Sequence, residues 1–198
     1  FEHFFSFPKK LKYQKFPKIK YDEAMLKYGT DKPDLRNPLI AFDITEIFVR
    51  DDVEFKIFKK LVKSGSFVRA IVTKNTKDKP RRFFDGIDKW AKEEGASGLA
   101  YFTFEKSSNI TAKGPVGKLF SEESLKEIMK ITSAEVGDSI FLACGKINDL
   151  EKITSTVEGN RENLNDIFKN LASLSDSLAD INFRQTVSNL DSTLRKAN

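Results

Sequence analysis

The sequence YDEAMLKYGTDKPDLR, residues 21–36, joins a short helical pattern to a charged segment that contains a proline. Its first half predicts a helix, because Tyr21, Met25 and Tyr28 recur at i, i+4 and i+7 and so share one face. Gly29 stands where a helix C-cap is expected, since glycine adopts a left-handed backbone without a Cβ penalty. The helix should therefore end at Gly29, and the charged half should begin there.

The charged half, residues 30–36, is built around Pro33. Its four charged side chains are Asp31, Lys32, Asp34 and Arg36. Proline fixes its own φ angle and moves the preceding residue out of the helical region, so this segment should be stiff and extended. A stiff charged segment can hold a binding site, or it can form a salt-bridged corner between two packed pieces. Physical arguments by themselves favour the corner.

Length and composition indicate one medium domain, or one domain and an extension. The chain has 198 residues, of which 39% are hydrophobic and 32% charged, as is typical of soluble globular proteins. No run of the sequence approaches the ~20 apolar residues of a membrane span. The N-terminus shows no signal-peptide pattern, and its start on Phe1 suggests a fragment. We therefore expect a cytoplasmic protein with no transmembrane segment.

Cysteine and histidine are too scarce for several classes of site. Cys144 is the single cysteine, which excludes an internal disulfide and agrees with a reducing compartment. His3 is the single histidine, so no zinc constellation is expected, and Ser–His or Cys–His chemistry would depend on the first few residues. We predict no metal site in this chain.

Positive charge is concentrated before residue 21. The formal net charge is +5, and residues 1–20 carry six lysines against the single acidic residue Glu2. These candidates for RNA contact are Lys9, Lys10, Lys12, Lys15, Lys18 and Lys20. Lysines interleaved with Phe and Tyr are compatible with phosphate attraction and base stacking. The alternative is a solvated lysine face beside buried phenylalanines, and physical arguments favour that alternative.

From residue 39 to about residue 150 the pattern predicts an α+β or α/β domain. Strands are expected at 67–73, 99–105 and 139–143, and the side chains of 99–105 should alternate between two faces. Helices are expected at 80–95 and at 121–132, the second capped by Ser121. The first helix should carry one apolar stripe, made of Phe83, Phe84, Ile87, Trp90 and Ala91. Residues 53–63 alternate first and become helical later, so the boundary there stays open. Residues 107–117 are predicted as a polar loop. The glycines and lysines in and beside this loop lack the spacing of a P-loop, so they are a weak signal for phosphate binding.

The tail, residues 151–198, is rich in Ser, Asn, Asp and Leu and predicts an amphipathic helix. A heptad spacing of 4-3-4-3 connects Ile167, Leu171, Leu174, Leu178 and Ile181. A helix with so narrow an apolar stripe requires a partner, so it could self-associate or lie against lipid. Its lysine-poor polar face argues against an anionic membrane surface.

Residues 21–36 resemble the segment that follows motif 2 in bacterial-type aspartyl-tRNA synthetases, just before their insertion domain. Three further stretches resemble landmarks of that insertion domain: GASGLAYFTFE at 95–105, GPVGKLF at 114–120 and GDSIFLA at 137–143. The insertion domain is in turn similar to one in the B subunit of the tRNA-dependent amidotransferase. The resemblance extends from residue 1 to about residue 150. From residue 154 the chain resembles, less specifically, the helical tail of mammalian-cell-entry-type lipid-transport proteins.

The resemblance implies a fold and a parent activity. The fold would comprise a basic connector and catalytic-core edge at 1–38, an insertion-type α+β domain at 39–150 and an amphipathic helical tail at 151–198. The parent would be a class II enzyme, usually homodimeric, which activates aspartate with ATP and Mg²⁺ and transfers it to the 3′ end of tRNA. The four charged residues Asp31, Lys32, Asp34 and Arg36 would lie at the rim of the catalytic core, as corner residues rather than catalytic ones.

The sequence departs from the family pattern in its catalytic motifs. It has no FRDED-type motif 2 and no GGGLG–IDR motif 3, whose arginines hold ATP, and no anticodon-binding barrel. Carboxylate activation requires an arginine or magnesium clamp on the phosphates. We therefore predict no catalytic residue and no cofactor bound by this chain alone.

Three functions stay open. The chain is part of an aspartate–tRNA ligase that cannot aminoacylate alone, or a tRNA-binding accessory module that acts through the basic front. The third alternative is a lipid-transport or coiled-coil assembly protein that acts through the tail. The specificity of the resemblance ranks them in that order.

Overall fold

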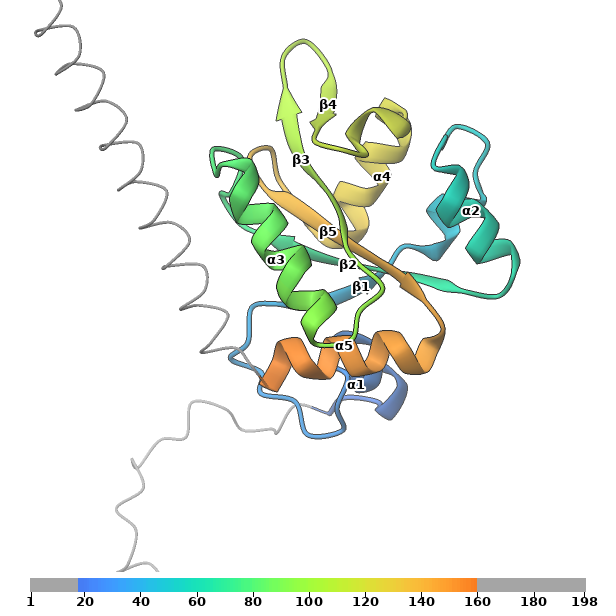
Figure 1. The fold of residues 1–198 in the computed structure, drawn as a ribbon, viewed down its shortest axis with the longest axis vertical. Coiled ribbons are helices and arrows are strands. Elements are labelled where there is room, and N and C mark those ends of the chain that lie inside the picture. Colours follow the sequence, from blue (N-terminus) through green and yellow to red (C-terminus); the bar gives the residue numbers. More distant parts are fainter. Residues whose placement is uncertain (1–17, 160–198) are drawn as a thin grey trace, which may run out of the picture.

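The computed structural model describes residues 18–159, which form a five-stranded sheet with helices on both faces (Figure 1). The elements in chain order are α1 (Tyr21–Tyr28), β1 (Ala41–Asp43), the 3-10 helix η1 (Thr45–Val49), α2 (Lys56–Lys63), β2 (Phe67–Thr73), α3 (Arg81–Glu93), β3 (Ala100–Lys106), β4 (Ile110–Lys113), the 3-10 helix η2 (Gly117–Leu119), α4 (Glu122–Thr132), β5 (Ser139–Gly145) and α5 (Ile147–Gly159). The predictions for Lys9, Lys10, Lys12, Lys15 and the heptad helix beyond residue 159 lie outside the described residues.

All strand pairs in the sheet are antiparallel, and the strand order is β1-β2-β5-β3-β4. The central pair is β2 with β5, which stay in register from Phe67 opposite Gly145 to Thr73 opposite Ser139. An antiparallel sheet with helices packed on its faces defines an α+β domain. The α+β prediction is thereby confirmed for the described residues, while the amphipathic tail stays a prediction.

The main core lies on the face of the sheet that η1, α2 and α4 cover. The strand residues of this core are Val68, Ala70, Phe102, Phe104, Ile140 and Leu142, all with 0% exposure. Phenylalanine rings fill the space toward α2: Phe55 and Phe58 stack with centroids 4.2 Å apart, and Phe48 meets Phe120 edge to face at 5.8 Å. Aromatic pairs of this kind contribute about 0.5–1.5 kcal/mol beyond the area they bury. Phe120 in turn packs on Phe102 of β3, with ring centroids 5.1 Å apart, so this aromatic cluster connects η1 to the sheet.

The opposite face of the sheet is covered by α3 and α5 (Figure 1). The predicted apolar stripe of α3 is confirmed, because Phe83, Phe84, Ile87 and Ala91 are buried and Trp90 is half-buried. Phe84 stacks on Tyr101 of β3, with ring centroids 4.4 Å apart and planes 5° from parallel. The alternation of β3 thus sends one set of side chains to each face, as its sequence predicts.

The prediction of a continuous polar loop at 107–117 is wrong. Ile110–Lys113 form β4, which pairs antiparallel with the end of β3. β4 is an edge strand of four residues in which half-buried and exposed side chains alternate. Edge strands carry polar residues because one side faces water. Composition alone therefore does not separate this strand from a loop, and pairing with β3 decides the outcome.

Helix α1 forms where it was expected, but its predicted face is partly wrong. Gly29 caps the helix with φ 70° and donates its N–H to Met25 O over 2.9 Å. Tyr21 is 67% exposed, whereas Ala24 and Tyr28 are buried. α1 packs against α5 and β1, and a small residue at the centre of a helix allows close approach of its neighbour. The inward face of α1 is therefore made by Ala24 and Tyr28, which are four residues apart.

Gly29 also lies directly against the backbone of α5. A Cβ atom built on Gly29 would lie 2.4 Å from Ser155 N and 2.5 Å from Glu151 O. Such distances are too short for any real side chain, so glycine is required both by the φ angle and by the contact between α1 and α5.

The predicted division at residue 150 falls within α5, which is continuous from Ile147 to Gly159. Leu150, Thr154 and Val157 are buried in this helix. The first turns of the expected tail therefore pack on the domain, and the three-part division at 1–38, 39–150 and 151–198 otherwise stays a prediction.

We expect Gly29→Ala to lower the free energy of unfolding by about 2–5 kcal/mol, because left-handed strain and a clash with α5 add. The matched control is Gly65→Ala, where φ is 81° but the nearest atom, Lys146 Nζ, is 3.7 Å from the added Cβ. The control should cost about 1–2 kcal/mol from strain alone. Urea unfolding followed by circular dichroism measures both. Equal losses in the two variants would contradict the close contact.

Candidate functional site

The charged segment at 30–36 is held together by its own side chains. Asp34 accepts hydrogen bonds from the Arg36 Nε at 2.8 Å, Nη2 at 2.7 Å and backbone N–H at 3.0 Å. Thr30 Oγ1 accepts the N–H of Lys32 at 3.3 Å. The Arg36 side chain is 82% exposed. The Asp34–Arg36 pair is therefore a local surface pair within one turn, and such pairs add little stability.

The structure separates the four predicted rim residues into two groups. Asp31 lines a shallow hollow of about 420 Å³ beside α1, together with Tyr21 and Pro33. Lys32, Asp34 and Arg36 are absent from that lining. The segment thus presents one carboxylate toward the hollow while Asp34 and Arg36 bind one another.

Asn37 is a positioning residue that sequence reasoning missed. It is 3% exposed, its N–H donates to Asp34 O at 2.9 Å, and its Oδ1 accepts the N–H of Leu39 at 3.0 Å. Asparagine commonly closes turns through bonds of this kind. The signal in the sequence was an asparagine directly after the charged segment, where a turn-closing residue is expected.

Lys18 and Lys20 are the two candidates for RNA contact within the described residues. Both side chains are exposed. Lys20 immediately precedes α1, and its carbonyl accepts the N–H of Ala24 at 2.9 Å. The structure therefore places these two lysines at the entrance to α1 with their charges in solvent.

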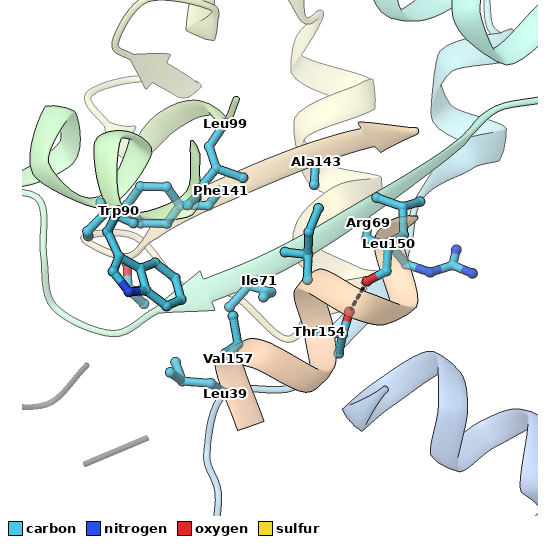
Figure 2. A pocket seen from close by; sticks show the side chains of 14 residues that line it. Leu39, Arg69, Ile71, Trp90, Leu99, Phe141, Ala143, Leu150, Thr154 and Val157 are labelled. Carbon is cyan, nitrogen blue, oxygen red and sulfur yellow. Dashed lines mark hydrogen bonds between the residues drawn. The ribbon is translucent and has the colours of Figure 1, made fainter. Parts of the chain in front are cut away.

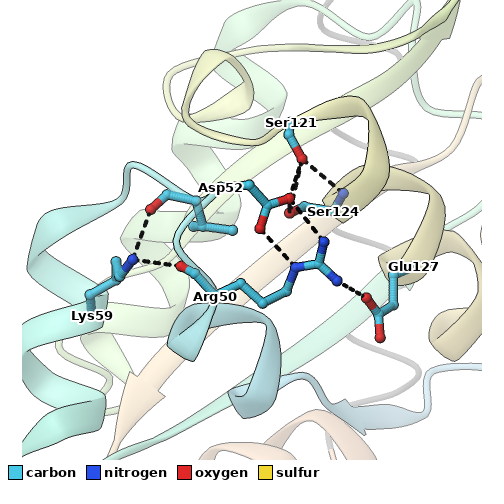
Figure 3. Close-up of polar contacts among 7 residues, drawn as sticks. Arg50, Asp52, Lys59, Ser121, Ser124 and Glu127 are labelled. Carbon is cyan, nitrogen blue, oxygen red and sulfur yellow. Dashed lines mark hydrogen bonds and ion pairs between the residues drawn. The ribbon is translucent and has the colours of Figure 1, made fainter.

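A polar network connects the turn after η1 to the start of α4 (Figure 3). Asp52 accepts bonds from Arg50 Nε at 2.8 Å, from Ser124 Oγ at 2.7 Å and from Ser121 Oγ. Ser121 in turn caps α4 by accepting the N–H of Ser124 at 3.0 Å, as its sequence position predicts. The Arg50 guanidinium, with the two serine hydroxyls, holds the pKa of Asp52 well below its usual range.

Both ends of this network are also anchored. Arg50 Nη1 forms an ion pair with Glu127, and Lys59 Nζ donates to the Arg50 carbonyl at 2.5 Å (Figure 3). Each charge in the network faces an opposite charge or a hydrogen-bond partner. The network therefore holds η1, α2 and α4 in place, and it leaves no cation for a substrate phosphate.

An apolar cavity lies between α3, α5 and the sheet (Figure 2). Its volume is about 50 Å³, which is room for a few water molecules. Trp90, Phe141 and Val157 are among its walls. Arg69 borders it, but the guanidinium points away from the apolar lining toward Asp43, with which it forms an ion pair. A space of this size and character cannot hold a nucleotide.

Arg69 and Asp43 form an ion pair that does not have the geometry of a hydrogen bond. Arg69 is 6% exposed, and its Nη1 lies close to the Asp43 carboxylate without the alignment of a hydrogen bond. Burial raises the pKa of Asp43, but bonds from Thr45 and the charge of Arg69 lower it overall. The two residues are opposite one another in the β1–β2 register. The pair therefore ties β1 to the sheet.

Two classes of site are not seen in the described part of the chain. Among residues 18–159, no three His, Cys, Asp or Glu side chains gather closely enough to hold a metal ion. No helix in the same range has the length and apolar character needed to cross a bilayer. Cys144 is half-buried at the core edge, and burial raises the pKa of its thiol to about 11, so it is a poor nucleophile.

The family model described as GAD domain matches residues 58–154, a range that contains β2 and β5. The chain is 78% identical over 147 residues to the aspartate–tRNA(Asp/Asn) ligase of Pelagibacter ubique (strain HTCC1062), with 74% of this chain and 25% of the relative covered. It is 46% identical over 147 residues to the ligase of that name from Beijerinckia indica, covering 74% of this chain and 24% of the relative. For the ligase of that name from Wolbachia pipientis wMel the identity is 48% over 155 residues, covering 78% and 25%.

The chain therefore carries a segment of a bacterial-type aspartyl-tRNA synthetase, as the resemblance at residues 21–36 predicts. It spans about a quarter of the length of the curated relatives that it matches.

We expect Asp52→Asn to lower the free energy of unfolding at pH 7 by about 1–2 kcal/mol, because charge-assisted bonds in a partly exposed site are lost. A carboxyl group whose pKa is lowered by folding stabilises the protein above its unfolded pKa of about 3.9 and loses that effect as the pH falls. The unsubstituted chain should therefore lose stability between pH 5 and pH 3 more steeply than the variant. Urea unfolding at several pH values measures the difference.

The matched control for this prediction is Asp51→Asn, at the exposed neighbouring position. Its stability should follow that of the parent chain at every pH. A variant at Asp52 that keeps the full pH dependence would show that the network in Figure 3 does not stabilise the folded state.

Proposed function

We propose that this chain provides the GAD domain and the charged segment before it in an enzyme that attaches aspartate to tRNA with ATP and Mg²⁺. The observation that carries the proposal is the identity of 78% over 147 residues with a ligase of that activity. The names of the relatives specify tRNA(Asp/Asn). We therefore extend the proposal to an enzyme that charges both tRNAs.

We further propose that this chain alone does not activate aspartate. Activation places negative charge on the phosphates of ATP, and a cationic clamp must stabilise that charge. Among the described residues, Arg36, Arg50 and Arg69 each contact a carboxylate of this same chain. This supports a division of labour in which phosphate chemistry belongs to the remainder of the synthetase. From the family resemblance we propose that this synthetase is a homodimer in the cytoplasm.

The charged segment at 30–36 is proposed to lie at the rim of the catalytic core. The Asp34–Arg36 pair supports a role as a corner, because it stiffens the turn without burying either charge. Asp31 and Lys32 remain the residues of this segment that can face the core. The basic front with Lys18 and Lys20 is proposed as one surface for tRNA.

The proposal is tested by a chimera. The 147 matched residues of the Pelagibacter ubique ligase are replaced by those of this chain, and aspartylation of tRNA is measured. Since 78% of these positions are identical, we expect kcat/KM within about tenfold of the parent ligase, a change of about 1.4 kcal/mol or less. A folded chimera without aspartylation would contradict the proposal.

The 198-residue chain by itself should show no aspartate-dependent ATP–pyrophosphate exchange above background. The intact relative serves as the positive control in the same assay. Exchange by the purified chain would show that it contains its own site for ATP activation, and the proposed division of labour would be wrong.

A further inference from the structure

An open cleft lined by cations lies between the loop before α3, the first turn of α3 and the β3–β4 hairpin. Its volume is about 560 Å³. The four cations on its walls are Lys77, Lys79, Arg81 and Lys113. No carboxylate is among the described residues that line it. Three separate segments of the chain therefore bring positive charge to one concave surface.

A buried carboxylate holds the loop that carries Lys77 and Lys79. Asp138 is 2% exposed and accepts the N–H of Asn75 at 3.0 Å and the Lys74 Nζ at 2.8 Å. Burial alone raises the pKa of Asp138, but Lys74 and two backbone N–H groups lower it overall. The carboxylate is thus charged and bonded, and it fixes the backbone from which Lys77 and Lys79 project.

The first turn of α3 contributes one of the cations of the cleft. Arg81 begins its first turn, which has no acidic residue. The N-terminal end of a helix bears a positive partial charge, so basic side chains there are unfavourable unless an anion is near. Arg81 contacts Asp85 at 3.5 Å, but these side chains are 83% and 57% exposed, so the contact neutralises little.

The opposite wall is formed by Lys113, Gly114 and Pro115, at the end of β4 and directly after it. Gly114 has φ 125°, and a Cβ atom there would lie 3.1 Å from Phe102 Cα and 3.1 Å from Tyr101 O. The hairpin backbone therefore lies directly on β3. Lys113 is 78% exposed, and its Nζ is 3.8 Å from Glu105, too far for a hydrogen bond.

We propose that this cleft binds consecutive phosphates of an RNA backbone. Small-molecule sites enclose most of their ligand in apolar walls, whereas this cleft is open and its charges are spread over three segments. Its rings, Phe84 and Tyr101, are 4% and 9% exposed, so it offers phosphate contacts rather than base stacking. The inference rests on the proposed function, which supplies the RNA, and adds a surface separate from the basic front.

The test measures the affinity of the 198-residue chain for tRNA over a range of salt concentrations. The test variant replaces three lysines of the cleft: Lys77→Gln, Lys79→Gln and Lys113→Gln. The control removes the same charge from exposed positions on α2, on the opposite face of the sheet: Lys56→Gln, Lys60→Gln and Lys63→Gln. Melting temperatures of all three proteins show whether they fold alike.

We expect the cleft variant to lose at least about tenfold in affinity near 0.1 M salt, and its slope of log K against log salt to fall by about 2 to 3. The control should stay within about twofold of the parent chain. Equal losses in the two variants, or no tRNA binding by the parent chain, would overturn the proposal. If the cleft variant melts lower, the single change Lys113→Glu at the exposed edge strand gives the same comparison.

A competition experiment separates RNA from a small anion. Inorganic phosphate at about 10 mM, compared with sodium chloride at equal ionic strength, should leave tRNA binding unchanged, because a single phosphate engages fewer of the spread cations. Specific displacement by phosphate would identify a small-anion site and overturn the proposal. Failure of the aspartylating chimera would instead overturn the enzyme function, since the binding assay does not depend on that activity.

Discussion

The pairing of β2 with β5 is the constraint on which the rest of the domain depends. Seven residue pairs hold these strands in one register. Because side chains of a strand alternate between faces, this register assigns Val68 and Leu142 to the main core and Phe141 to the face under α3 and α5. A shift by one residue would exchange the two sets and bury the charge of Arg69 in the phenylalanine core. Both faces therefore specify the same register.

Charged groups at the ends of the strands then place the loops. Arg69 and Asp43 join β1 to β2, and Asp138 at the start of β5 holds the loop before α3. Asp52 performs the same task between η1 and α4. Asp138 is buried, and a buried polar group is costly unless it is bonded, so Asp138 restricts its loop to the conformation that satisfies it. Asp43 and Asp52 are partly exposed and act through their ion pairs and hydrogen bonds. The loop that carries Lys77 and Lys79 of the cleft is held by Asp138.

A structural feature was predicted correctly when its sequence signal lay within a few neighbouring residues. The stripe of α3, the alternation of β3 and the cap at Ser121 were predicted correctly, because each depends on residues within a few positions of one another. The strand β4 was missed, since an edge strand acquires its identity from a partner. The inward face of α1 was misassigned at Tyr21, because an eight-residue helix has two plausible faces and only the neighbouring helix selects one.

The amino-acid sequence by itself determined that helices and strands mix in one domain, because helical and strand periods are local, and it indicated the family, because the segment at 21–36 is highly specific. The antiparallel pairing of the strands then decided between the α+β and α/β classes. It also showed that Gly29 ends a helix. Only the tertiary structure decided that α5 passes against that glycine, and that cations at 77, 79, 81 and 113 share one cleft. These residues lie on separate segments, and their juxtaposition arises from strand order and register, which no local pattern encodes.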